Sequence, residues 1–87
     1  MSQIVKLYDA VCSGKEDKNF RFSDLQRLLV ALGFVLSRVC GDHFIYAKSG
    51  VAEIINIQPD KRDSSKAKSV QVRQVRAIIL KYGMEVV

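Results

Sequence analysis

The sequence predicts an α+β protein, a two-layer sandwich in which helices cover one face of a three-stranded antiparallel sheet, in the order α-α-β-β-β-α. Apolar residues recur at helical spacing near both ends of the chain. Residues 34–57, between these ends, are rich in β-branched and aromatic side chains, as strands are. The turns expected there, Gly41-Asp42 and Ser49-Gly50, are too short to connect parallel strands. A sheet of this kind needs helices over one face.

Two helices are expected in the first third of the chain. The first runs from Gln3 to Cys12 and is followed by a polar loop at residues 14–19. The second begins at Ser23, the predicted N-cap, and ends at Gly33, which supplies a left-handed stop. Its apolar stripe consists of Leu25, Leu28, Leu29 and Leu32.

Strands and a third helix follow. The strands are predicted at residues 34–40, 43–48 and 51–57. Pro59 ends the last strand because proline cannot donate to the ladder. A polar loop at residues 58–68 leads to a helix over residues 70–82, with Gly83 as its C-cap. The core face of this helix is predicted to hold Val72, Val75, Ile78, Ile79 and Tyr82.

Length and composition predict one small domain over residues 1–87. Of its residues, 48% are hydrophobic and 26% are charged, which excludes a disordered or collagen-like chain. The longest apolar run is far below the roughly 20 residues that cross a bilayer. The stretch Met1–Lys6 lacks a secretion signal, so we expect a cytoplasmic protein. Cys12 and Cys40 are expected to be buried thiols rather than a disulfide.

The excess positive charge lies in the last third of the chain. The net charge is +5, and residues 1–60 carry seven basic and seven acidic side chains that cancel. The candidate RNA-binding residues are Lys61, Arg62, Lys66, Lys68, Arg73 and Arg76. A confined basic region favours nucleic acid as the partner, because contacts to backbone phosphates position a protein on a duplex without specifying sequence. Together with a three-stranded sheet and flanking helices, these residues suit double-stranded RNA, which is recognised by its shape and its 2′-hydroxyls. The alternative is a solvated basic surface that serves solubility.

Few residues offer chemistry of their own. The sequence has no phosphate-binding loop, dinucleotide fingerprint or Cys/His cluster, so it predicts neither an organic cofactor nor a metal. The one histidine, His43, is the candidate acid–base catalyst, because imidazole is the side-chain group suited to proton transfer near neutral pH. A lone histidine at a strand start is more often structural. Alternation places His43 with Ile45 and Ala47, on a sheet face that the sequence does not decide.

In the order of these helices, strands and turns, the sequence resembles the HicA toxin family. The resemblance rests on Phe22-Ser23-Asp24-Leu25, Leu32-Gly33-Phe34, a strand with Arg38, the turn and strand Gly41-Asp42-His43-Phe44-Ile45-Tyr46, and the run Lys66–Val75. It covers residues 20–83, the common core, closely and the N-terminal helix, residues 1–13, more loosely. It implies a fold like the double-stranded RNA-binding domain and the activity of an mRNA interferase. It also implies a HicB antitoxin partner that covers the active histidine.

Carried over by position, Gly41 matches the motif glycine and His43 the catalytic histidine. Two positions depart from the family pattern. Asp42 stands where the family has serine, and its carboxylate repels a phosphate while favouring a protonated imidazole. Phe44 stands where a second histidine is frequent, which removes a second acid–base group.

Three functions therefore remain open. The first is a toxin that cuts mRNA without a metal, with His43 exchanging protons at the 2′-OH or the leaving oxygen. The second is a non-catalytic module that binds double-stranded RNA, which Asp42 and Phe44 favour. The third is an inactive toxin-like protein that only binds a HicB-like partner through its basic face.

Overall fold

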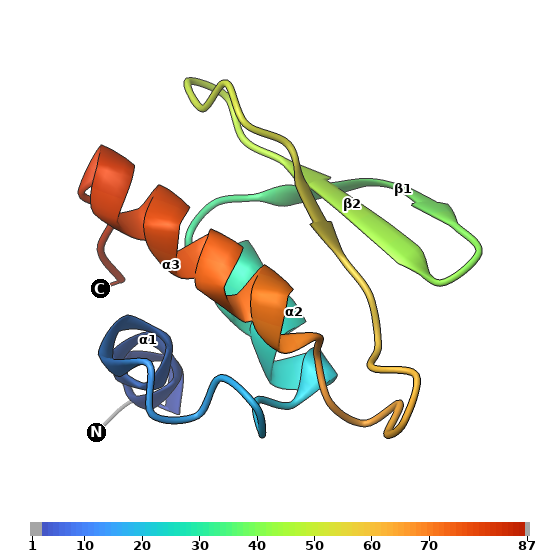
Figure 1. Cartoon of the computed structure of the whole chain (residues 1–87). Coiled ribbons are helices and arrows are strands. Elements are labelled where there is room, and N and C mark those ends of the chain that lie inside the picture. Colours follow the sequence, from blue (N-terminus) through green and yellow to red (C-terminus); the bar gives the residue numbers. More distant parts are fainter. Residues whose placement is uncertain (1–2, 87) are drawn as a thin grey trace.

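The computed structural model describes residues 3–86, so that Met1 and Ser2 of the N-terminal stretch lie outside it. Its elements are α1 (Gln3–Ser13), α2 (Phe22–Ala31), β1 (Val35–Cys40), β2 (His43–Ala47), β3 (Ile55–Ile57) and α3 (Ser69–Tyr82). The predicted order α-α-β-β-β-α and the α+β class are confirmed. Figure 1 shows the sheet on one side of α2 and α3, with α1 beneath these two helices.

The sheet has the strand order β1-β2-β3, and both pairs are antiparallel. In β2 and β3, Phe44, Tyr46, Ile55 and Ile57 belong to the helix-covered core or pack against it. Because neighbouring residues of a strand point to opposite faces, His43 lies on the other face. Alternation alone left open which face of the sheet holds His43. In the structure, the histidine faces away from the core.

The core forms between the helices and the covered face of the sheet. The predicted leucine stripe of α2 and its C-cap is buried, and the buried positions of α3 include Val72, Val75 and Ile79. α1 packs against both α2 and α3, and its Val11 has no exposed surface. The N-terminal helix is therefore part of the same hydrophobic core as the rest of the described chain.

The predicted start of α2 was wrong by two residues. The N-cap is Arg21, which makes no side-chain cap hydrogen bond, and Ser23 is the second residue of the helix. The loop that precedes α3 supplies the missing partner, because the backbone N–H of Phe22 donates to the carbonyl of Ser65 at 2.9 Å. Tertiary contact thus replaces the local side-chain cap that the sequence suggested. At the far end of α3, the predicted C-cap Gly83 is confirmed, with a φ of 61°.

The third strand is shorter than predicted, since residues 51–54 do not join the ladder. Two residues of this segment bond instead to the end of α3: Glu53 accepts hydrogen bonds from Lys81 and Tyr82, and the backbone N–H of Ala52 donates to the Tyr82 hydroxyl at 3.3 Å. The hydrogen bonds from Lys81 and Tyr82 lower the pKa of Glu53 to about 2. Tyr82, predicted to face the core, is therefore exposed at this polar contact.

The strand β1 lies at the edge of the sheet, and all six of its side chains are exposed. Cys40 is among them, so the prediction of a buried thiol at this position was wrong. Cys40 is exposed because β1 pairs only with β2 and projects past the helices (Figure 1). Cys12, on α1, is partly buried against the core.

Candidate active site

The turn between β1 and β2 places His43 at the first position of β2. Cys40 and His43 face each other in the antiparallel register, which leaves Gly41-Asp42 as a two-residue turn. Gly41 has a φ of 61°, the positive value that the first position of a type II′ turn requires. The side chain of His43 is 44% exposed, so a substrate can reach the imidazole.

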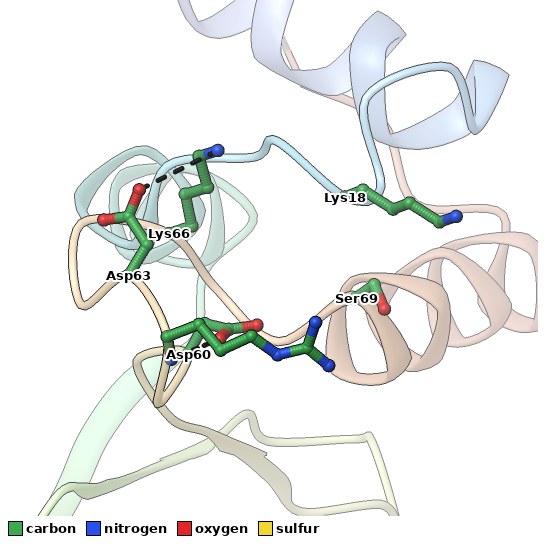
Figure 2. Close-up of a pocket in the computed structure, with 6 residues that line it drawn as sticks. Lys18, Asp60, Asp63, Lys66 and Ser69 are labelled. Carbon is green, nitrogen blue, oxygen red and sulfur yellow. Dashed lines mark hydrogen bonds and ion pairs between the residues drawn. The ribbon is translucent and has the colours of Figure 1, made fainter.

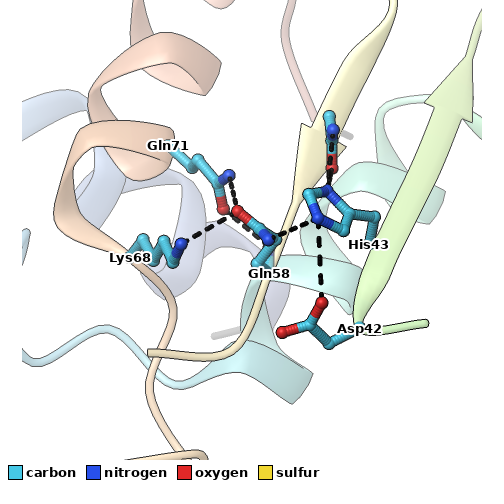
Figure 3. A network of polar contacts seen from close by, with 6 residues as sticks. Asp42, His43, Gln58, Lys68 and Gln71 are labelled. Atoms are coloured by element: carbon cyan, nitrogen blue, oxygen red, sulfur yellow. Dashed lines mark hydrogen bonds and ion pairs between the residues drawn. The ribbon is translucent and has the colours of Figure 1, made fainter. Parts of the chain in front are cut away.

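Both ring nitrogens of His43 have partners within the protein (Figure 3). Nε2 lies 2.8 Å from Nε2 of Gln58, and Nδ1 lies 3.3 Å from Oδ1 of Asn56. The Asp42 carboxylate approaches the ring to 3.7 Å from Nε2, which is ion-pair but not hydrogen-bond distance. Asn56, in β3, and Gln58, directly after it, therefore orient the imidazole ring, whereas Asp42 does not.

Gln58 connects the histidine to the start of α3. Its Oε1 accepts hydrogen bonds from Nζ of Lys68 at 3.0 Å and from Nε2 of Gln71 at 3.1 Å. Its backbone N–H donates to Oε1 of Gln71 at 2.6 Å. One amide group thus separates an imidazole from a lysine ammonium, and Figure 3 shows the four side chains as one continuous network.

Three amides of this network were not predicted from the sequence: Asn56, Gln58 and Gln71. A signal for two of them was present, because Ile55-Asn56-Ile57-Gln58 alternates apolar and polar residues as a half-exposed strand does. The register then places Asn56 opposite Ile45, on the face of His43. Gln71 gave no such signal: it is a polar residue within the buried side of α3.

A polar cleft of about 390 Å³ lies beside the start of α3 (Figure 2). It is lined by Lys18, Asp60, Arg62, Asp63, Lys66 and Ser69. Hydrogen bonds from the hydroxyl and backbone N–H of Ser65 lower the pKa of Asp63, so this loop carboxylate stays charged. Ser69 lines the cleft, and Lys68, the residue before it, belongs to the hydrogen-bond network of His43 (the histidine network). The two sites therefore adjoin at the start of α3.

The predicted basic residues do not form one cluster. Lys68 belongs to the histidine network, whereas Arg62 and Lys66 line the cleft, where Lys18 joins them. Lys61 and Arg73 are exposed on the loop and on α3. The structure therefore divides the predicted basic residues between the histidine network, which holds Lys68, and the cleft, whose lining also includes two aspartates.

Arg76 belongs to neither group. Its guanidinium bonds both carboxylate oxygens of Asp17 at 2.9 and 3.1 Å, and also the carbonyl of Val11 at 3.1 Å. The hydrogen bond to Asp17 raises the pKa of Arg76, which is charged throughout the ordinary pH range. A guanidinium held in this way joins α3 to α1 and its loop, so we leave Arg76 out of the proposed RNA-binding surface.

Replacing Arg76 with alanine is expected to destabilise the fold by about 2 kcal/mol, because the half-buried Asp17 and the carbonyl of Val11 lose their partner. Replacing Arg73 with alanine is the matched control: this exposed arginine of the same helix should change stability by less than about 0.5 kcal/mol. Urea unfolding of both variants measures the difference. Equal stability of the two variants would contradict the structural role of Arg76.

Comparisons with protein-family models, with curated proteins and with solved structures found no match. Within residues 3–86, no group of three or more His, Cys, Asp or Glu side chains is arranged to hold a metal ion. Across the same part of the chain, no helix has both the length and the apolar character needed to cross a bilayer.

Proposed function

We propose that this protein is a toxin of the HicA type, an endoribonuclease that acts on mRNA in the cytoplasm and is restrained by a HicB-like antitoxin. Cleavage is metal-independent and depends on His43. Lys68 holds the scissile region of the RNA, and Lys61, Arg62, Lys66 and Arg73 contact the backbone further along.

One observation carries the proposal: an accessible imidazole lies one amide group away from a lysine ammonium. Cleavage of RNA needs an acid–base group at the reacting oxygens and a cation near the phosphate. His43 is the acid–base group, and Lys68 is the cation that the Gln58 amide connects to it. The backbone amides of the first turn of α3, which starts at Ser69, add a positive potential beside Lys68.

The reaction needs only groups that the RNA and this chain supply. The 2′-oxygen attacks the adjacent phosphorus, the bond from phosphorus to the 5′-oxygen breaks, and the 2′-proton passes to a base. The departing 5′-oxygen takes up a proton from an acid or from water. His43 takes part in this proton exchange, and Lys68 offsets the charge that develops on the phosphate.

Replacing Asp42 with serine is expected to increase cleavage about fivefold. The Asp42 carboxylate lies 3.7 Å from Nε2 of His43, where it repels an approaching phosphate by an energy of the order of 1 kcal/mol at the surface. Initial cleavage rates at low salt measure the effect. Asp9→Ser, the same charge change on the exposed side of α1, is the control. A rate that falls in Asp42→Ser would contradict this account of Asp42.

The toxin function is tested by inducing the chain in bacterial cells and following growth together with transcript length. We expect growth to stop as full-length mRNAs shorten, and we expect His43→Ala to abolish both effects. Co-expression of a HicB-like protein should restore growth. Normal growth with intact transcripts, at a protein level confirmed by blotting, would contradict the proposal.

A non-catalytic module for double-stranded RNA is the second candidate. The observation in its favour is that both nitrogens of His43 are already hydrogen-bonded within the protein, beside a carboxylate. This candidate predicts duplex RNA retained in a salt-sensitive complex with no shortening over time. Gel shifts and RNA length, measured on the same samples, separate it from the toxin.

A further inference from the structure

We propose that Gln58 is a positioning residue that fixes His43 as the neutral tautomer with its proton on Nδ1 and a lone pair on Nε2. This inference rests on the proposed function and deepens it, because it assigns His43 the role of general base at the 2′-OH. A chain of hydrogen bonds that starts at the backbone N–H of Gln58 and ends at the imidazole determines this tautomer.

The first step fixes the amide of Gln71. The backbone N–H of Gln58 is a donor only, and it lies 2.6 Å from one amide atom of Gln71, which must be the oxygen. Gln71 is only 8% exposed, so its side chain has little freedom to turn away. The other end of this amide, Nε2, therefore donates toward Gln58.

The second step fixes the amide of Gln58. One of its ends meets two donors, the amide nitrogen of Gln71 at 3.1 Å and the ammonium of Lys68 at 3.0 Å. A lysine ammonium has no acceptor, so this end must be the oxygen. The Gln58 end that faces His43 is consequently the NH₂ group, which is a donor.

The third step fixes the imidazole. A donor at 2.8 Å from Nε2 of His43 requires a lone pair on that nitrogen, so the proton of the neutral ring lies on Nδ1. Asn56 accommodates this tautomer without selecting it, since its oxygen and its nitrogen lie at 3.3 and 3.2 Å from Nδ1. Asp42, at 3.7 Å from Nε2, accepts no hydrogen bond from an unprotonated nitrogen.

The consequence for the proposed reaction is a defined proton acceptor. Nε2 carries the lone pair that accepts the 2′-proton, and the RNA hydroxyl replaces the amide of Gln58 as the donor to this nitrogen. Lys68 faces the same amide from the opposite end, so before RNA binds, the lysine that we propose to contact phosphate holds the positioning residue in place.

Nitrogen NMR of the imidazole tests the inference without RNA. His43 is the only histidine of the chain, so a protein labelled with ¹⁵N-histidine gives two ring signals that need no further assignment to a residue. At alkaline pH, where imidazole is neutral, we expect a pyridine-like Nε2 and a pyrrole-like Nδ1 in the wild type. A protonated Nε2, or a mixture of tautomers, would overturn the inference whatever the activity toward RNA.

Gln58→Glu reverses the polarity of the contact and sharpens the test. A carboxylate has only acceptors, so Nε2 must now carry a proton, and the two ring signals should exchange character or both become pyrrole-like. Cleavage should then fall by at least about 10²-fold, the contribution of a positioned base. Gln74→Glu adds the same charge at an exposed site of α3 and should leave both signals unchanged. Signals that do not respond to Gln58→Glu would overturn the role of Gln58.

The two proposals fail separately. A wild type with the expected tautomer but no RNA cleavage contradicts the ribonuclease function and leaves the assignment of the tautomer intact. A wild type that cleaves RNA with Nε2 protonated contradicts the positioning role and leaves the ribonuclease function intact.

Discussion

Replacing His43 with alanine is expected to slow RNA cleavage by about 10²- to 10⁴-fold, the range that a positioned acid–base group contributes. The fold should be unaffected, because His43 is partly exposed at the end of a hairpin and lies outside the hydrophobic core. Initial rates on one RNA, measured alongside circular dichroism of each protein, give the result.

Cys40→Ser serves as the control for this change. Cys40 lies opposite His43 in the register of β1 and β2 and is also exposed, but it has no part in the network of the imidazole. Its substitution should leave the rate within a factor of two or so of the wild type, as surface changes generally do. Equal rates for His43→Ala and the wild type would remove His43 from the mechanism.

Replacing Leu28 with alanine is expected to destabilise the protein by about 3–5 kcal/mol, since it leaves a cavity in the core. Leu28 has no exposed surface in α2, the helix that packs against α1. A chain of this length has a free energy of unfolding of about 4–13 kcal/mol, so the variant loses a large share of its stability. Urea unfolding at constant temperature measures the change.

The control for Leu28 comes from the same helix. Val30 is 62% exposed, and Val30→Ala should alter the free energy of unfolding by about 0.5 kcal/mol or less. A similar loss in both variants would mean that α2 does not bury the face that the structure assigns to it.

Structural features that depend on residues close together in the sequence could be predicted from the sequence. The leucine stripe of α2, the Gly41-Asp42 turn and the Gly83 cap depend on periodicity or on one residue's backbone freedom, and all three are confirmed. Errors arose where a distant segment supplied the partner. The loop carbonyl of Ser65 caps α2 in place of Ser23, and the end of α3 holds residues that were expected in β3.

The residues of the candidate site likewise divide into those that could be predicted from the sequence and those that could not. His43 and Lys68 were identified because imidazole and ammonium groups carry recognisable chemistry at any position. The amides of Gln58 and Gln71 acquire a role only where the end of β3 meets the start of α3, and this contact joins residues 13 positions apart. Arg76 shows the converse: its charge suggested a phosphate contact, whereas its partners lie on α1 and the following loop.

The most direct test of the central claim is a time course of the purified protein in EDTA on two oligonucleotides. One is all RNA, and the other has the same sequence with a single 2′-deoxynucleotide at the site of cleavage. We predict that the RNA is cut without metal and that the 2′-deoxy linkage resists, because the attacking oxygen is missing. An intact RNA in EDTA, or equal cleavage of both oligonucleotides, would contradict metal-free cleavage through the 2′-OH with His43 as its acid–base group.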